Sequence, residues 1–297
     1  MSNKISIGID LGGTKIMVGA INNEGEVLGT PIKIATKSVD AAQKIIERIL
    51  NSVEQLIQQL NLTINHIKGI GIGTTGPLDI TKGIILECPQ LPTMHYFALK
   101  NAVQSYFGIN VFVNNDANCL IYAETVFGCA TEKNMVLGFT LGTGIGSAVI
   151  INGKIINGAR SAAGEVWASP YKEGIIEDYI SGEGVANIYT KIAGIPKNPL
   201  EIEELAHQGN KEALQTWNEF GAHLAAPIAW AINLLDPDIV VIGGSISNAY
   251  PFFKKSLLNN LKKTVCPVPD KTTPIALAKL GNYAGFIGAA CLVLKNN

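Results

Sequence analysis

Residues 7–22 read IGIDLGGTKIMVGAIN, and residues 137–152 read LGFTLGTGIGSAVIIN. In each stretch an apolar strand, a glycine-rich turn and a second apolar strand follow one another in the same register, 130 residues apart. This order is typical of a β-hairpin. Glycine at the turn lets main-chain N–H groups approach an anion without interference from a Cβ atom. Two such hairpins, one in each half of the chain, are suited to holding a phosphate chain between them, so the sequence predicts a kinase.

The size and composition of the chain are those of an ordinary globular protein with two domains. Its 297 residues exceed the length at which one hydrophobic core usually stops growing. Hydrophobic residues make up 47% and charged residues 16%, as in a well-packed fold. The formal net charge of -1 provides no basic field, so nucleic acid and anionic membrane are poor partners.

Cysteine spacing and hydropathy indicate the compartment in which the protein is expected to occur. The five cysteines are widely spaced, without a CxxC pair, so neither a disulfide framework nor a thiolate zinc site is predicted. Asp10 and Lys15 come too early for a signal peptide, and the longest apolar run, 222–235, is too short to span a bilayer. We therefore expect a soluble, reduced, cytoplasmic protein.

Strands and helices alternate along the rest of the chain. Hydrophobic periodicity predicts helices at 40–60, 117–127, 212–235 and 284–295, and buried strands at 67–73, 111–113, 239–242 and 274–280. The proline-rich residues 267–274 are expected to form a loop. Alternating strands and helices indicate an α/β fold, and the two hairpins make its sheets mixed. The natural domain boundary lies near 117–128.

Asp10 is the candidate metal ligand. Its carboxylate precedes the first glycine turn, where Mg²⁺ and phosphates would meet, whereas the second copy carries Thr140 at the equivalent place. This asymmetry suits one metal ion bridging phosphates on one side and neutral donors on the other. The alternative is an ordinary glycine turn beside a solvated aspartate.

Asp116 is the candidate general base. It follows the buried strand 111–113, and ligand sites gather at the carboxyl ends of strands in α/β sheets. Phosphorylation of a sugar hydroxyl needs a carboxylate within hydrogen-bond reach of that hydroxyl. The alternative is that Asp116 only forms the N-cap of the helix that follows.

Three further segments carry weaker signals. Glu165 and Glu177 lie in apolar or small surroundings and are suited to accept hydrogen bonds from a polyol, although a solvated loop is the alternative. Gly243-Gly244-Ser245 follows a buried strand, where a nucleotide base or ribose lies close to the main chain or a helix N-terminus meets an anion; a plain turn is the alternative. The segment 243–245 does not fit GxGxxG, and no GxxxxGK[ST] occurs in the chain.

Taken together, these segments resemble the ROK family of repressors, open-reading-frame proteins and sugar kinases, within the sugar kinase/Hsp70/actin superfamily. The resemblance covers nearly the whole chain. DLGGTK at 10–15 looks like the family's first phosphate motif, LGTGIG at 141–146 like its second, and NDAN at 115–118 like its catalytic segment, in which the aspartate is the base. GGS at 243–245 resembles the adenosine motif, and GNYAG at 281–285 the closing segment.

The resemblance implies two actin-like (ribonuclease H-like) α/β domains with mixed sheets around a central cleft. Residues 1–117 with about 284–297 would form the N-terminal domain, and 118–283 the C-terminal one. The implied activity is glucokinase-like, ATP-dependent phosphorylation of a hexose or N-acetylhexosamine by a homodimer, with Mg²⁺ on Asp10. Asp116 is the expected base, and sugar contacts are expected from Gly76, Gln90, Asn115, Glu165, Trp167 and Glu177. Nucleotide contacts are expected from Asp10, Gly12, Gly13, Thr14, Lys15, Thr140, Gly142, Thr143, Gly144, Gly243, Gly244 and Ser245.

The chain departs from the family pattern around its sugar motif. Relatives read E-x-G-H where this chain has Glu165-Val166-Trp167-Ala168, so the histidine that touches both sugar and zinc in relatives is Ala168. The cysteine-rich zinc loop that follows in relatives is deleted, and residues 165–182 contain no Cys or His. We therefore expect no zinc, with Trp167 and Tyr171 ordering this region by packing. Gln90 stands where relatives usually have Asn.

Two other functions remain open at this point. One is a sugar-responsive regulator, since the family includes repressors, but the first hairpin begins at Ile5, so no DNA-binding module is expected before it. The other is a catalytically weak sugar-binding protein, because the histidine of the family motif is lost.

Overall fold

The computed structural model describes residues 5–295, which form two compact units. The first unit takes the residues up to Glu132, the segment Gly153–Ala163 and the residues from Lys279 onward. The second takes Lys133–Asn152 and Gly164–Ala278. The domain boundary expected after residue 117 stays a prediction. In this grouping the helix that starts at Asp116 lies wholly within the first unit.

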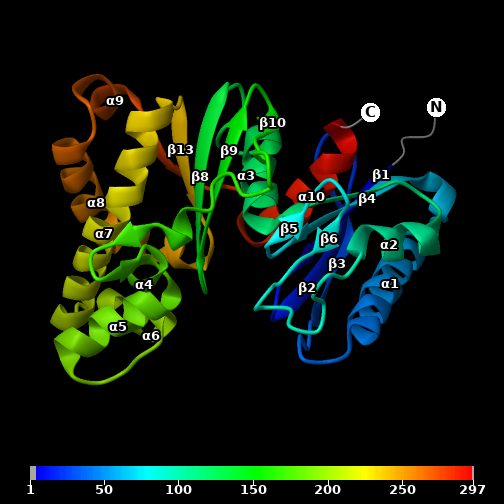
Figure 1. The fold of residues 1–297 in the computed structure, drawn as a ribbon, viewed down its shortest axis with the longest axis horizontal. Coiled ribbons are helices and arrows are strands. Elements are labelled where there is room, and N and C mark those ends of the chain that lie inside the picture. Colours follow the sequence, from blue (N-terminus) through cyan, green and yellow to red (C-terminus); the bar gives the residue numbers. More distant parts are fainter. Residues whose placement is uncertain (1–4, 296–297) are drawn as a thin grey trace. The chain divides into compact units, whose positions relative to one another are not determined.

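The first unit is built on a five-stranded mixed sheet (Figure 1). Its order is β3-β2-β1-β4-β7, in which β1, β2 and β3 are antiparallel and β1, β4 and β7 are parallel. These strands are β1 (Ile5–Leu11), β2 (Lys15–Ile21), β3 (Val27–Ala35), β4 (Ile67–Thr74) and β7 (Val111–Asn115). The parallel ladder brings the carboxyl ends of β1, β4 and β7 to one edge of the sheet, where Asp10 and Asp116 lie.

Four long helices belong to the first unit: α1 (Ala42–Gln59), α2 (Leu99–Phe107), α3 (Asp116–Phe127) and α10 (Ala284–Lys295). The apolar stripe of α1 is buried in the core. α10 approaches the sheet closely because Gly8 and Gly71 have no side chain; a Cβ on either would collide with the backbone of α10. Shorter elements are β5 (Leu78–Asp79), β6 (Ile84–Ile85), β10 (Lys154–Ile155) and 3₁₀ turns at Ile64–His66 and Gly281–Tyr283.

The second unit repeats the arrangement of four of these strands, β2-β1-β4-β7. β8 (Met135–Leu141) and β9 (Ile145–Ile151) are antiparallel, and β8, β13 (Ile239–Gly243) and β14 (Ile275–Leu277) are parallel, in the order β9-β8-β13-β14. Both expected glycine hairpins are therefore confirmed. The second hairpin occupies the place in its sheet that the first occupies in its own.

Helices make up most of the rest of the second unit. They are α4 (Glu177–Ile180), α5 (Gly182–Ala193), α6 (Pro199–His207), α7 (Lys211–Leu235), α8 (Tyr250–Thr264) and α9 (Pro267–Thr272). Small pieces are β11 (Pro170–Tyr171), β12 (Gly174–Ile175) and 3₁₀ turns at Val166–Ala168 and Ser245–Ala249. The core is aromatic where α7 meets α8: ring centroids of Phe220 and Phe253 lie 5.2 Å apart, and those of Trp217 and Phe220 lie 5.5 Å apart.

Two secondary-structure predictions are wrong. Residues 267–274 do not form a loop throughout, because α9 begins at Pro267; proline is tolerated in the first helical turn, where its missing N–H would have no helical partner. The strand expected at 274–280 is limited to Ile275–Leu277. Among residues 5–295, no helix combines the length and apolar character that crossing a membrane requires.

Candidate active site

Asp10 occupies the end of β1 and lies beside the first turn of α10. A Cβ on Gly285 would come within 2.9 Å of Asp10 Oδ2, so the carboxylate and the start of this helix are in close contact. Burial raises the pKa of Asp10 above its ordinary value, and the nearby Lys15 lowers it to a smaller extent. Helix N-termini stabilise negative charge, so this position is suited to a carboxylate in spite of its burial.

Asp116 is the first residue of α3, directly after β7. The N-cap of α3 is Asn115, whose Oδ1 accepts the N–H groups of Ala117 at 2.9 Å and Asn118 at 3.3 Å. The alternative that Asp116 serves only as N-cap is therefore wrong. Asp116 Oδ1 accepts the Ala117 N–H at 2.8 Å, and Oδ2 accepts no hydrogen bond from the residues that the structure describes.

The charge of Asp10 affects the protonation of Asp116. Burial, and then the charge of Asp10, raise the pKa of Asp116 to about 6. Asp116 nevertheless keeps part of its surface open. A carboxylate with this pKa is ionised at neutral pH and is a stronger base than an ordinary aspartate. The arrangement is typical of a site that transfers protons.

Gly76 and Asn115 lie next to Asp116 at the same sheet edge. A Cβ on Gly76 would lie 3.6 Å from Asn115 Nδ2, so the amide group is adjacent to the turn that follows β4. The Asn115 oxygen is used as a helix cap, which leaves its NH₂ group as the remaining donor of the side chain. Two of the expected sugar-binding residues and the expected base are thus brought together.

The tip of the first hairpin exposes two main-chain donors. Gly12 N–H donates to Lys15 O at 3.0 Å and closes the turn. The N–H groups of Gly13 and Thr14 have no partner among residues 5–295. Gln90 lies beside this tip, since a Cβ on Gly13 would be 2.8 Å from the Gln90 carbonyl oxygen. A glycine at position 13 therefore lets the Gln90 loop approach the hairpin.

The second hairpin leaves an equivalent pair of donors. Gly142 N–H donates to Gly144 O at 3.0 Å, and the N–H groups of Thr143 and Gly144 have no partner in the described part of the chain. The hairpin is held by α4 and α5: Glu177 Oε2 accepts the Ile145 N–H at 3.0 Å. Glu177 is therefore not in a solvated loop but starts a helix under the hairpin.

Gly243-Gly244-Ser245 joins this second cluster. Thr140 at the end of β8 is paired with Gly243 at the end of β13. Gly244 has a φ of 86° and lies against the backbone of Leu141, where any Cβ would collide. Ser245 Oγ would lie 3.8 Å from a Cβ on Gly142. These contacts bring the second phosphate motif and the adenosine motif together. The next α-helix, α8, begins only at Tyr250, after a 3₁₀ turn.

Glu165 and Trp167 form a separate pair in the second unit. Trp167 Nε1 donates to Glu165 Oε2 at 2.6 Å, and 39% of the Trp167 side chain is exposed. Tyr171, in contrast, packs against Tyr179 and His223, with ring centroids at 5.2 and 5.8 Å. Tyr171 is thus held by ring contacts, whereas part of the Trp167 ring is exposed to solvent. The role of Tyr171 in ordering this region stays a prediction. The expected absence of zinc stays a prediction.

A magnesium ion fits the donors of the first unit. The carboxylates of Asp10 and Asp116 are close enough to repel each other, and hard oxygen ligands suit Mg²⁺. Among residues 5–295, no three His, Cys, Asp or Glu side chains gather in a metal-binding arrangement. The ion would therefore take its other ligands from phosphates and water, as Mg²⁺ usually does.

Thr36 is a contact of the first hairpin that the sequence does not reveal. Its hydroxyl donates to Gly12 O at 2.6 Å, and its N–H donates to Thr14 O at 3.0 Å. The residue lies at the end of β3, 22 residues beyond Thr14, in a stretch without any motif. Only the fold brings it to the hairpin.

The model of the ROK family matches residues 6–296. N-acetyl-D-glucosamine kinase of Photobacterium profundum is 29% identical over 311 residues, which cover 97% of this chain and 99% of that protein. Glucokinase of Thermotoga maritima is 27% identical over 317 residues, which cover 97% and 96%.

A ROK family glucokinase from Streptomyces griseus, solved in complex with glucose and AMPPNP, has a similar structure. The TM-score is 0.83 at 27% identity, covering 97% of this chain and 98% of that one. The fold of the chain is accordingly the α/β fold with two mixed sheets found in the actin-like ROK sugar kinases.

Proposed function

This chain belongs to the ROK family and is a sugar kinase, and on that premise we propose that it transfers the γ-phosphoryl group of ATP to a hydroxyl of a hexose or N-acetylhexosamine. The proposal rests mainly on the environment of Asp116. Its carboxylate has a pKa of about 6, lies beside Asp10, and keeps Oδ2 without a hydrogen bond from any described residue.

Asp116 acts as the general base in this proposal. The Ala117 N–H fixes Oδ1 at 2.8 Å, so the orientation of the carboxylate is set before the sugar arrives. Oδ2 then accepts the proton of the attacking hydroxyl as the bond to phosphorus forms. Asn115 Nδ2, Gly76 and Gln90 contact the sugar from the first unit.

Asp10 holds Mg²⁺ together with the nucleotide phosphates. When bound, the ion supplies positive charge that offsets the charge on the phosphate oxygens. Lys15, which already lowers the pKa of Asp10, adds a further cation near this group. The N–H groups of Gly13, Thr14, Thr143 and Gly144 donate to phosphate oxygens.

The second unit supplies the remaining contacts. Gly243, Gly244 and Ser245 contact the adenosine, and Thr140 contributes a hydroxyl next to the second hairpin. Glu165 and Trp167 bind the sugar, with the exposed indole against an apolar face of the ring. Glu177 uses Oε2 for the Ile145 N–H and keeps Oε1 for a sugar hydroxyl. The homodimer implied by the family resemblance stays a prediction.

The test is an assay of ADP release across a panel of hexoses and N-acetylhexosamines, with Mg·ATP. We expect saturable turnover on at least one sugar, and a loss of about 10²–10⁴-fold in kcat in Asp116→Asn. Asp79→Asn, which changes an aspartate that only caps a turn with Lys82, is the matched control. Sugar binding without turnover on the whole panel would favour the weak sugar-binding or regulatory alternative.

A further inference from the structure

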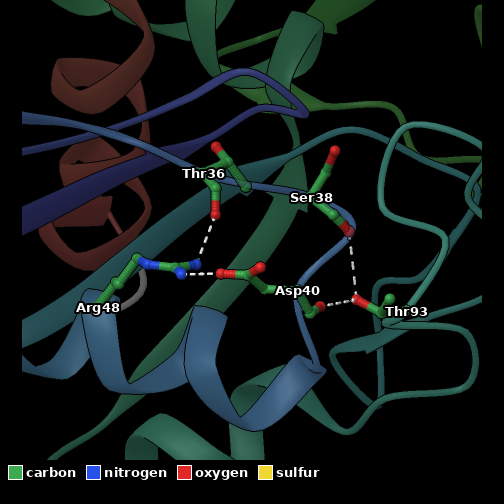
Figure 2. A network of polar contacts seen from close by, with 5 residues as sticks. All are labelled: Thr36, Ser38, Asp40, Arg48 and Thr93. Carbon is green, nitrogen blue, oxygen red and sulfur yellow. Dashed lines mark hydrogen bonds and ion pairs between the residues drawn. The ribbon is translucent and has the colours of Figure 1, made fainter.

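Residues 36–40 connect β3 to α1 and form two separate attachments within the first unit. Figure 2 shows the polar contacts at both ends of this segment: Thr36 at its start, Ser38 and Asp40 towards its end, Arg48 on α1, and Thr93 on the loop before α2. None of these residues carries a motif or has a role in the proposed reaction. Their contacts, however, connect them to residues that have a role in the proposed reaction.

The first attachment reaches the phosphate hairpin. Thr36 is fully buried, and its hydroxyl and N–H donate to the carbonyl oxygens of Gly12, at 2.6 Å, and Thr14, at 3.0 Å. These two carbonyls flank Gly13. The Gly12 carbonyl belongs to the peptide group that presents the Gly13 N–H, so Thr36 sets the orientation of this donor before a phosphate binds. The Gly13–Thr14 peptide group, which presents the Thr14 N–H, lies between the two carbonyls that Thr36 fixes.

The second attachment reaches the loop that carries Gln90. Thr93 Oγ1 lies 2.6 Å from the Asp40 carbonyl oxygen and 3.3 Å from that of Ser38, and it donates to them. Gln90 is three residues before Thr93, in the same loop, and its carbonyl oxygen faces Gly13. The end of the 36–40 segment therefore determines how closely the Gln90 loop approaches the hairpin.

Arg48 joins the two attachments. Its Nη1 donates to the Thr36 carbonyl oxygen at 2.8 Å, and its Nη2 forms an ion pair with Asp40 Oδ2. The planar guanidinium presents donors in a rigid fork, so one side chain fixes both ends of the segment at once. A lysine has a single ammonium on a flexible stem and cannot reproduce this geometry.

We propose that Arg48 is a positioning residue that aligns the phosphate hairpin, through Thr36, with the Gln90 sugar loop, through Thr93. The inference rests on the proposed function, because it takes Gly13 and Thr14 as phosphate donors and Gln90 as a sugar contact. Arg48 lies on helix α1 and touches neither substrate in this proposal. The KM for Mg·ATP and the KM for sugar nevertheless both depend on it.

The kinetic test separates the two attachments. Thr36→Val keeps the shape and removes the hydroxyl; we expect the KM for Mg·ATP to rise about five- to tenfold, as for one lost hydrogen bond, and the KM for sugar to stay within about twofold. Thr93→Val should give the reverse pattern. Arg48→Met and Arg48→Lys should raise both KM values, while Thr36→Ser and the neighbouring exposed Lys44→Met should resemble the wild type.

Amide hydrogen exchange provides a readout that does not need activity. We expect faster exchange at Gly12 and Thr36 in Thr36→Val, at Leu91 and Met94 in Thr93→Val, and at all four in Arg48→Met. The Thr36 N–H forms part of the first attachment, the Gly12 N–H closes the hairpin turn, and the N–H groups of Leu91 and Met94 close turns in the Gln90 loop. A merely structural role would lower kcat and raise both KM values together in every variant, in proportion to the lost thermal stability.

The outcomes distinguish the two proposals. If the wild type phosphorylates no sugar, the proposed function fails, and the exchange pattern still decides whether Arg48 aligns the two elements. If the wild type is active but Arg48→Met changes each KM by less than about twofold and leaves exchange at all four amides unchanged, the positioning role is refuted. The same conclusion follows if Thr36→Val and Thr93→Val show no difference between nucleotide and sugar.

Discussion

The two glycine hairpins have the same architecture but are held by different groups. Both lie in the same position of equivalent sheets, β1–β2 in one unit and β8–β9 in the other. Thr36 supports the first with neutral donors that bind its carbonyl oxygens. The second is supported by a carboxylate, that of Glu177, on the Ile145 N–H, and by the Gly182 N–H, which donates to Gly142 O at 2.8 Å.

This difference shows which groups come from the repeated hairpin sequence and which come from the residues around it. The repeat provides two pairs of N–H donors, one in each unit, that have no partner within residues 5–295. The acids differ: the first unit places two largely buried aspartates, Asp10 and Asp116, near each other at the strand ends, whereas the carboxylate of Glu177 in the second unit is partly used to hold the hairpin. We therefore expect the first unit to carry the metal and proton chemistry, and the second to bind the nucleotide with neutral groups.

The largest effect is expected from Asp116→Asn. The amide keeps the shape and the contact with Ala117 but cannot accept the sugar proton, so kcat should fall about 10²–10⁴-fold. KM for both substrates should change little. Steady-state kinetics on the best sugar measure this, and near wild-type turnover would remove Asp116 from the role of base.

A smaller effect is expected when the hairpins are made alike. Asp10→Thr gives the first hairpin the residue found in the second, and we expect kcat/KM for Mg·ATP to fall about 10²-fold, with a higher Mg²⁺ requirement, because a preorganised charge is lost. Thr140→Asp, which gives the second hairpin an acid, should not restore activity to Asp10→Thr. Restoration in the double variant would show that the two hairpins are interchangeable.

The next effect is on the pH dependence of kcat/KM, which should change by about tenfold per pH unit on the acidic side. Because the pKa of Asp116 is about 6, kcat/KM should fall close to tenfold for each pH unit below this value, as the base becomes protonated. A profile that stays flat down to pH 5 would mean that the base has an ordinary, lower pKa.

The raised pKa of Asp116 also affects the free energy of unfolding. Raising the pH is expected to increase activity but to decrease stability. The pKa is raised from 3.8 to about 6 in the folded state, so folding favours the protonated form. The stabilisation from this group is complete below pH 3.8 and is lost as pH rises through about 6. At neutral pH Asp116→Asn should therefore be more stable than the wild type, by about 1–3 kcal/mol. Thermal unfolding at pH 7.5 provides the measurement, and a lower melting temperature would contradict the pKa assignment.

The smallest effect is expected from the support of the second hairpin. Glu177→Ala removes the acceptor of the Ile145 N–H, and we expect a rise of about tenfold in the KM for Mg·ATP. Glu177→Gln keeps an oxygen acceptor at the same place and should retain most of the nucleotide affinity, while its KM for sugar rises. Equal effects of Ala and Gln on the nucleotide would mean that the hydrogen bond to Ile145 is irrelevant.

Much of the fold follows from local sequence patterns. The two hairpins, α1, α7 and α10 are predicted because strand alternation, helical spacing and glycine turns act within a few residues. α9 is not predicted, because a proline-rich stretch is typical of a loop, although proline also starts helices. The segment 153–163, which groups with the first unit, could not be assigned because only long-range contacts such as Asn114 Nδ2 to Asn157 Oδ1, at 3.1 Å, place it there.

Part of the candidate site is also predictable from the sequence. Asp10, Asp116 and the glycine motifs are identified by motif, and the structure places each at a strand end or hairpin tip. The supports are not predictable: Thr36 is 24 residues from Gly12, and Glu177 is 32 residues from Ile145. Neither contact has a sequence signal, because a hydrogen bond between distant segments depends on the folded chain rather than on spacing.

The central claim is that both hairpins bind the phosphates of one nucleotide, and amide NMR during titration with Mg·AMPPNP tests it most directly. We predict that the N–H signals of Gly13 and Thr14 in the first unit, and of Thr143 and Gly144 in the second, shift together with one common dissociation constant. Asp10→Thr should weaken all four responses equally. Shifts confined to one hairpin, or two different dissociation constants, would contradict the account.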